Sequence, residues 1–323
     1  MFVPEYTITS KALKNISTIE YAKAIIENTT ILPSWEDQLK KEATVRIISG
    51  STKSLGISID PQSIKSAIDG LSPSPSIQVS NILKAINTCG VLSKDGEITE
   101  EDLKEINKAL TTNGVYRNKK LPGKIDPEEI LAETVQLFDW VSGLDAKDTH
   151  PVITAAIIRG ALELVSPFEN LNEITACLAT YLFLKTSGYS LKSFISLESY
   201  YNNTKYEYEQ LIDSLDNREP DFTEWVDYFT EGLASEVSTV SQKIKLLAKD
   251  TKVAKATGRI SVSKRQERIV EYLQDYGVLQ NSDFGKLFPE KSEDTVLRDL
   301  KKLIDIDIIQ KVGSTKSSRY QLK

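Results

Sequence analysis

Apolar residues recur every three or four positions through most of the first 250 residues, which is the spacing of amphipathic helices. Ile16, Ile19, Ala22 and Ile25 form one such series, and no alternating strand pattern competes with it. The pattern therefore predicts a mostly α protein. Its expected helices cover residues 11–48 (interrupted near 32–33), 61–68, 79–88, 99–110, 127–141, 151–165, 171–186, 197–214 and 222–250.

The pattern changes after residues 251–261, a polar segment that we interpret as a linker. Three helices are predicted beyond it, over residues 263–277, 281–288 and 292–305. Two short strands follow, with Ile309 and Lys311 against Tyr320 and Leu322 around a Gly-Ser-Thr-Lys-Ser-Ser tip. This order predicts a C-terminal winged helix-turn-helix, made of three helices plus a β-hairpin wing.

Charge is divided unevenly between these parts. The whole chain carries a formal net charge of -6. From Lys252 to the end, 15 Lys and Arg stand against 10 Asp and Glu, or +5, which leaves 25 against 36, or -11, for the residues before it. The protein as a whole is therefore no polyanion binder, and any nucleic-acid contact must come from a local patch in the tail.

Cysteine and histidine are scarce. Cys89 and Cys177 are too few for a disulfide framework or a thiolate metal site, so we expect no metal. His150 is the single histidine, and as it directly precedes Pro151 we interpret it as a helix-entry residue. The chain opens without the layout of a secretory signal, and no apolar run approaches the roughly 18 residues of a membrane span. We therefore expect a cytoplasmic protein with no membrane partner.

A loop between two predicted helices, SPFENLNEITAC at residues 166–177, matches H-P-F-x-D/E-G-N-G-R-x-x-R at Pro167, Phe168 and Asn172. With its flanking helices it resembles the core of the Fic family, over roughly residues 5–235. The resemblance implies an all-helical Fic-type domain and, in the family, protein adenylylation from ATP and magnesium. There, glycines and backbone N–H groups cradle the phosphates while the histidine deprotonates a target hydroxyl.

Most positions that would carry this chemistry differ from the family motif. Ser166 stands at the catalytic histidine, and a serine hydroxyl is no base at pH 7. The other departures are Asn170 at the acidic magnesium ligand, Leu171 and Glu173 at the two glycines, and Ile174 and Cys177 at the two arginines. Losing a single transition-state donor typically costs on the order of 100- to 1000-fold in rate, so we expect no transfer activity.

The family's inhibitory element, S/T-x-x-x-E-G/N, has a counterpart from Ser51 to Gly56, with Leu55 at the glutamate position. Residues 115–129 resemble a shortened form of the flap that docks target peptides. The expected domains are 1–95, an N-terminal helical region with this degenerate loop; 96–250, a Fic-like core; and 251–323, the winged helix. A helical body unrelated to Fic remains the alternative interpretation.

The segment SEDTVLRDLKKL at 292–303 resembles the recognition helix of DeoR-like winged-helix domains, S-x-x-T-V-x-R-D-L-x-x-L. The resemblance implies DNA binding, although solvated charges or a protein-binding wing would give the same composition. Glu293 and Asp294 near the helix start would repel phosphates. The candidate DNA contacts are Ser292, Thr295, Arg298, Lys301 and Lys302 on the helix, and Lys311, Lys316 and Arg319 on the wing.

Together these features favour a DNA-binding, transcription-regulatory protein with an inactive Fic-like body and no cofactor. A homodimer would strengthen such binding, and the ligand of the Fic-like cleft stays open. The alternatives are an adenylyltransferase or nucleotide-binding protein with a rearranged site, which would use ATP and magnesium, and a protein-interaction scaffold.

Overall fold

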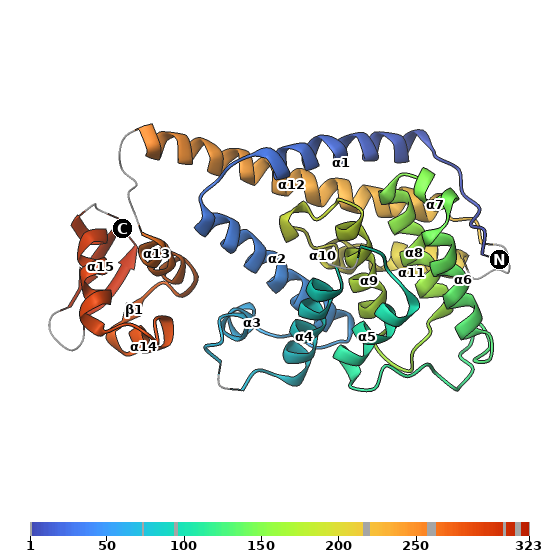
Figure 1. Ribbon diagram of the computed structural model, residues 1–323, viewed down its shortest axis with the longest axis horizontal. Helices are drawn as coiled ribbons and strands as arrows, with labels where there is room; N and C mark the ends of the chain where they lie inside the picture. Colours follow the sequence, from blue (N-terminus) through green and yellow to red (C-terminus); the bar gives the residue numbers. More distant parts are fainter. Residues whose placement is uncertain are drawn as a thin grey trace.

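The computed structural model describes residues 2–72, 74–93, 96–215, 220–256, 263–305, 308–313 and 318–322, and the described chain is mostly helical (Figure 1). Its α-helices are α1 Ser10–Asn28, α2 Pro33–Ser54, α3 Pro61–Ile68, α4 Ile77–Leu92, α5 Glu100–Thr111, α6 Ile130–Ser142, α7 Leu144–Asp148, α8 Pro151–Val165, α9 Asn172–Thr186, α10 Glu198–Asn203, α11 Lys205–Ser214, α12 Thr223–Ala256, α13 Lys264–Tyr276, α14 Phe284–Leu287 and α15 Glu293–Asp305. Short 3-10 turns are η1 Leu191–Ser193 and η2 Asn281–Asp283, and the strands are β1 Leu279–Gln280, β2 Ile309–Val312 and β3 Arg319–Leu322.

Local start signals place most of these helices where the sequence predicts them. Thr99 and Asp102 form a capping box at the start of α5. The His150 side chain accepts a hydrogen bond from the Val152 N–H at the start of α8, which confirms it as a helix-entry residue. Such caps satisfy N–H groups that lack a partner inside the helix, so they fix a helix start without help from distant residues.

Two predicted boundaries are wrong. Residues 251–256, interpreted as linker, continue α12 because the sequence offers no glycine or proline before Gly258. The single helix predicted over 197–214 is broken into α10 and α11 at Thr204, whose hydroxyl hydrogen-bonds Tyr228 on α12. Tertiary contact thus overrides local helical preference at that point.

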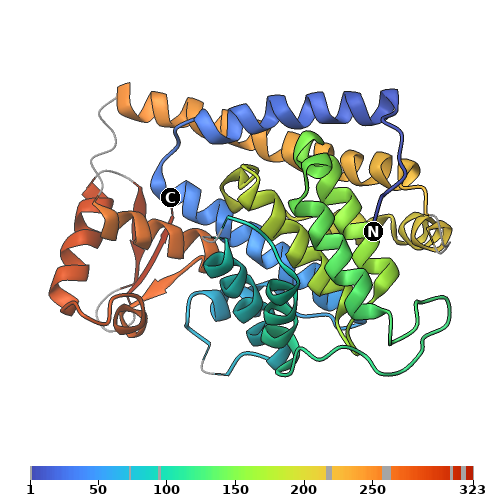
Figure 2. The ribbon, with the colours of Figure 1, turned by 45° about the vertical axis from the view of Figure 1, so that its right-hand side comes forward.

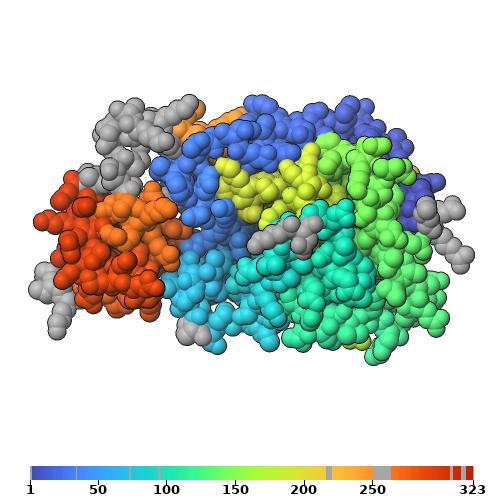
Figure 3. All heavy atoms as spheres, viewed as in Figure 1, coloured from blue at the N-terminus to red at the C-terminus, as the bar shows by residue number. Residues whose placement is uncertain are grey.

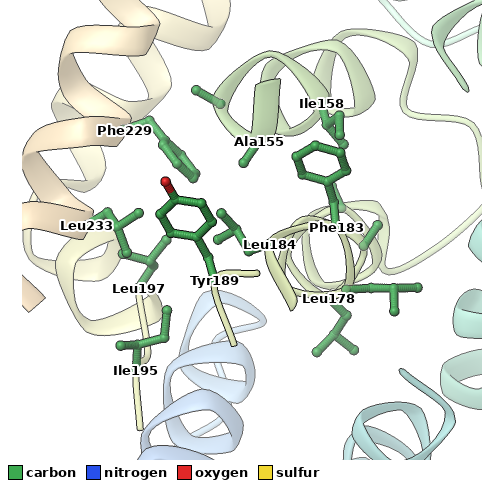
Figure 4. Packing of buried hydrophobic residues seen from close by; sticks show 14 of the residues in the cluster. Ala155, Ile158, Leu178, Phe183, Leu184, Tyr189, Ile195, Leu197, Phe229 and Leu233 are labelled. Carbon is green, nitrogen blue, oxygen red and sulfur yellow. The ribbon is translucent and has the colours of Figure 1, made fainter. Parts of the chain in front are cut away.

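The core of the body surrounds α8, which is buried on almost every side. Figure 4 shows its Ala155 and Ile158 beside Phe183 and Leu184 of α9, with Phe229 and Leu233 of α12 closing the other side. Helix α1 runs along α12 (Figures 1 and 2). Thr9 hydrogen-bonds Asp227 and Tyr21 hydrogen-bonds Lys245, so the residue numbers rise together along both helices and the two helices are parallel. The loop joining α8 to α9 therefore projects from the buried core of the body.

A second hydrophobic cluster lies in the C-terminal unit, between α13, α14, α15 and a small antiparallel sheet of order β1-β3-β2. Ile309 pairs with Leu322 and Lys311 with Tyr320, so the predicted hairpin residues do face one another. Strand β1 was not predicted, because two residues give no alternation to detect. The predicted helix over 281–288 is the 3-10 turn η2 followed by the single turn of α14.

A buried ion cluster joins this unit to the body. Lys41 of α2 lies 2.8 Å from Asp69, 2.6 Å from Asp275 and 3.9 Å from Glu271. Lys65 of α3 adds a second cation 2.9 Å from Asp275, whose side chain is fully buried. The C-terminal unit therefore rests on α2 through α13, at the left of the molecule in Figure 3.

None of the described helices is both long enough and apolar enough to cross a membrane.

Candidate functional site

The loop between α8 and α9 is held in shape by the residues that match the Fic motif. The Asn172 side chain accepts from the Phe168 N–H at 2.7 Å and donates to the Phe168 carbonyl at 2.8 Å. Phe168 is buried against the ring of Tyr116. Leu171, which stands at a glycine position of the motif, has a left-handed backbone with φ 59°. A branched side chain disfavours this conformation, so contacts elsewhere hold the loop in a shape that suits glycine.

Arg117, from the flap-like segment, fastens the same loop and was not singled out from the sequence. It is buried, and its guanidinium donates to the carbonyls of Ser166 at 2.8 Å and Val165 at 3.2 Å. Its backbone N–H donates to the Pro167 carbonyl, next to a bridge between Tyr116 and Phe168. Burial lowers the pKa of Arg117 without neutralising it at physiological pH. This arginine binds backbone, which leaves none of these donors for a ligand.

The predicted catalytic positions have structural partners. Ser166 caps the end of α8 with φ 43°, is 8% exposed, and donates its hydroxyl proton to the Glu163 carbonyl at 2.7 Å. The Asn170 side chain is exposed to solvent, while its carbonyl accepts from Asn107 at 3.0 Å. No base activates the serine, because its hydroxyl already donates to a main-chain carbonyl.

Arg159 of α8 lies beside the start of α9, close to the motif's two arginine positions, Ile174 and Cys177. It is 1% exposed, and its guanidinium donates to the Glu173 carbonyl at 2.6 Å and to the Tyr208 hydroxyl at 2.9 Å. It also pairs with Glu163 at 3.1 Å. Since these partners stabilise the cation, the pKa of Arg159 rises well above its usual value despite the opposing effect of burial. A lone arginine within an apolar helix was the signal in the sequence that could have marked it.

Little space remains around this arginine. A cavity of about 10 Å³ lies between Arg159, Glu173, Cys177 and Glu198, close to the smallest volume that holds one water molecule. Burial raises the pKa of the Glu173 carboxyl from its usual value. The Cys177 thiol lies 3.2 Å from Glu198, and burial raises its pKa well above the ordinary value, so it is no nucleophile.

The counterpart of the inhibitory element forms the end of α2. Ser51 lies beside the small cavity and is buried, together with the half-buried Ser54. Leu55, at the glutamate position, is 41% exposed and does not line the cavity. Gly56 ends the helix with φ +75°. The structure thus brings the end of α2 to the start of α9, but Leu55, which stands at the family's glutamate position, is exposed and lies outside the cavity.

The structure brings together part of the predicted DNA-contact set. Arg298, Lys301 and Lys302 are exposed and, by their helical spacing, share one face of α15. Ser292 and Thr295 lie at the start of the same helix, with their hydroxyls 3.0 Å apart. Lys311 and Arg319 occupy opposite faces of the hairpin, because Lys311 pairs with Tyr320 and Val312 with Arg319. Lys316 lies outside the described residues.

No family model matches the chain. Over 114 residues, or 31% of this chain, it is 30% identical to protein adenylyltransferase fic-1 of Caenorhabditis briggsae. The match spans only 22% of that protein's length. A solved Fic family protein from Desulfovibrio desulfuricans G20 is similar with a TM-score of 0.64 and 18% identity, covering 100% of this chain and 98% of the other. Residues 134–508 of Fic-1 from C. elegans give a TM-score of 0.60 at 17% identity, covering 74% of each chain. The chain therefore has the fold of Fic proteins.

Proposed function

We propose that the protein is a DNA-binding regulator, in which the C-terminal unit acts as a winged helix on a Fic-type body that has lost nucleotidyl transfer. One observation carries the proposal: Arg298, Lys301 and Lys302 form an exposed cationic face on α15, and within the described residues no carboxylate pairs with any of them. Arg298 does donate to the main-chain carbonyl of Asp294 at 3.4 Å. Phosphate contacts require cations without a carboxylate partner, since counterion release supplies most of the non-specific affinity.

The placement of α15 supports this role. The unit contacts the body through α13, whose Asp275 and Glu271 meet Lys41, while α15 lies on the outer side (Figures 1 and 2). Buried Asp299 of α15 is tied to Arg265 at 2.7 Å, which fixes α15 against α13 and leaves its cationic face outward. A duplex can approach this face without displacing the body.

Acidic side chains limit the strength of this binding. Asp294 and Asp305 lie on the same helical face as Arg298 and repel phosphates. A single unit would therefore bind weakly, and we propose a homodimer as the form that binds tightly. We also propose a cytoplasmic location.

Loss of transfer activity is supported by the groups that occupy the motif region. The Arg159 guanidinium is bound to protein oxygens, and the Glu173 carboxylate lies close by. Small-molecule sites typically enclose about 300–1000 Å³, and the cavity of about 10 Å³ at this point falls far below that range. For this reason we propose neither ATP nor magnesium as a cofactor.

The test is DNA binding by the full chain, measured by fluorescence anisotropy on a mixed-sequence duplex over a series of salt concentrations. We expect measurable affinity at low salt that falls steeply with salt. The double variant Arg298→Gln, Lys302→Gln should weaken it and reduce the salt slope by about two, or about one for each phosphate that the protein no longer neutralises. Lys84→Gln, which removes an exposed lysine from α4, is the matched control and should change nothing.

An unchanged affinity in the double variant, or no binding to any duplex at low salt, would refute DNA binding through α15. A separate measurement covers the enzymatic alternative: titration calorimetry with ATP and magnesium, and transfer of label from α-labelled ATP to protein. Saturable ATP binding with label transfer would overturn the inactive assignment and leave the DNA result unaffected.

A further inference from the structure

A larger cavity lies further along α9, toward the C-terminal end of this helix. It has a volume of about 120 Å³ and is enclosed by α2, α4, α9 and the segment from Tyr189 to Ile195. Its walls are mainly apolar, with Ile47, Ile86, Leu178 and Ile195 among them. Figure 4 shows Ile195, Tyr189 and Leu178 around the end of α9, above the blue ribbon of α2. A closed apolar cavity of about 150 Å³ in another protein takes up benzene, so this partly open cavity of about 120 Å³ is close to the size that holds such a group.

The rim of the cavity is polar. It carries Lys185 of α9 and the hydroxyls of Ser190 and Ser193. Among the described residues, no carboxylate or other acceptor pairs with the Lys185 ammonium group, and no side-chain hydrogen bond engages either serine hydroxyl. Within that part of the chain, three exposed donors thus lie at the edge of an apolar cavity without protein partners.

An unusual stretch of backbone begins directly after Ser190 and includes Ser193. Leu191, Lys192 and Ser193 are consecutive non-glycine residues with left-handed φ values of 45°, 52° and 59°. Each such residue is strained, and runs of them persist only where surrounding contacts enforce them. Buried Leu191 and Phe194 supply those contacts by anchoring the turn in the core. Strain of this kind clusters at ligand-binding sites, and here it includes Ser193 on the cavity rim, while Ser190, directly before the strained residues, has an ordinary helical backbone.

One wall of the cavity is open at Gly90 of α4. A Cβ atom built at Gly90 would meet nothing within 4 Å, although the residue lines the cavity. A single carbon added at this position therefore meets no neighbouring atom. The cavity can be filled by substitution at that position while its walls stay intact.

We propose that this cavity binds a small organic acid, with an apolar body the size of a benzene ring or a branched C4–C5 chain and one carboxylate. The body fills the space between Ile47, Ile86 and Ile195, and the carboxylate accepts hydrogen bonds from Lys185 and the serine hydroxyls. An amine would meet the lysine's like charge, and a nucleotide far exceeds the available volume.

The cavity adjoins the small cavity at Arg159 and the part of α2 that carries Lys41. The ring of Tyr181 forms part of its wall, while the Tyr181 hydroxyl donates to Glu198 at 2.9 Å beside the small cavity at Arg159. Thr44 of α2 lines it one turn beyond Lys41, which holds the C-terminal unit. A regulatory effect of the ligand on DNA binding would rest on the proposed function, whereas binding of the acid does not.

The test uses the full chain labelled at isoleucine δ1-methyl groups and titrated with benzoate, with benzylamine as the charge-reversed probe of equal size. We expect saturable shifts at the methyls of Ile47, Ile86 and Ile195, with a dissociation constant on the order of 1 mM or lower. The Ile309 methyl, in the C-terminal unit, should not move. Benzylamine should bind at least tenfold more weakly.

Two variants check the site. Gly90→Leu fills the cavity and should abolish the shifts, with Gly90→Ala as the control that adds a single carbon. Lys185→Gln changes only an exposed side chain and should weaken benzoate binding about tenfold, while leaving the binding of its neutral isostere, benzamide, unchanged. The proposal is overturned if no saturable shift occurs, if folded Gly90→Leu binds benzoate as well as the native chain, or if Lys185→Gln leaves the preference for the acid intact.

Discussion

Replacing Lys41 by methionine tests what holds the C-terminal unit on the body. The Lys41 side chain is 8% exposed and contributes the central cation of the cluster formed with Asp69, Glu271 and Asp275. Methionine keeps most of the volume of the aliphatic stem and removes the charge. The carboxylate of Asp275, fully buried, would then keep only Lys65 at 2.9 Å and the Gln38 amide at 3.2 Å.

The expected size of the effect follows from that residual pairing. Removing one partner of a buried ion pair typically costs about 3–5 kcal/mol, because the remaining charge stays buried without compensation. Since Asp275 retains a second cation, the lower end applies, about 3 kcal/mol, or roughly a hundredfold in the ratio of docked to undocked C-terminal units. The penalty disappears when the unit separates and the carboxylates reach water, so it should appear as undocking and not as unfolding of either core.

Small-angle scattering measures this separation directly. We expect Lys41→Met to increase the radius of gyration while circular dichroism keeps its helical signal. Lys40→Met is the matched control, because Lys40 is its exposed neighbour and pairs only loosely with Asp37 at 3.7 Å. Exposed pairs contribute about 0–1 kcal/mol. A Lys41→Met protein as compact as the native chain, or an equal expansion in Lys40→Met, would show that the cluster does not hold the unit.

Three further predictions concern the ionic and packing features of the body and its interface. Burial in the docked form raises the pKa of the Glu271 carboxyl above its usual value of 4.5. The docked form therefore takes up a proton more readily than the undocked form, and docking should strengthen as pH falls from 7 toward 4.5. Glu271→Gln should remove this pH dependence of the radius of gyration. Arg159→Met should cost about 3–5 kcal/mol in urea unfolding because it strands buried partners, while Lys205→Met, which breaks an exposed pair, should cost under about 1 kcal/mol. Gly160→Ala should destabilise the fold by about 1–3 kcal/mol, since its Cβ would lie 2.8 Å from the indole nitrogen of Trp225. Gly90→Ala meets no neighbour and should stabilise the fold by about 0.5–1 kcal/mol. Equal effects of the two substitutions would refute the packing argument.

The sequence predicted those features that neighbouring residues determine. The capping box at Thr99, the Pro61 start of α3 and the entry residue His150 each act within one helical turn, so their signals are visible in a single chain. The facing residues of the hairpin were predicted for the same reason. The Fic fold itself was accessible only through the spacing of a few loop residues, Pro167, Phe168 and Asn172, which the structure shows fastened together.

Contacts between distant positions could not be predicted in this way. Arg117 reaches carbonyls 48 and 49 residues along the chain, and Lys41 meets Asp275 at a separation of 234 residues. Neither residue belongs to a motif, and a buried cation looks in sequence like any other charged position on a helix. The end of α12 was misjudged for the opposite reason, because a polar composition was taken as linker where helix propensity continued.

Under the proposed function, Ser166→His alone should not confer nucleotidyl transfer. A histidine at position 166 would still sit on the left-handed end of α8, beside a loop whose glycine positions hold Leu171 and Glu173. The nearby cation, Arg159, is paired with Glu163 and bound to the carbonyl at the start of α9, and only its Nε is left without a partner. A triphosphate would have to displace those contacts, and the displaced carboxylate would then face it at close range in a low-dielectric site. Under the proposed function, Arg159 holds the body together, and the binding surfaces open to this chain are the cationic face of α15 and the cavity beside Tyr189.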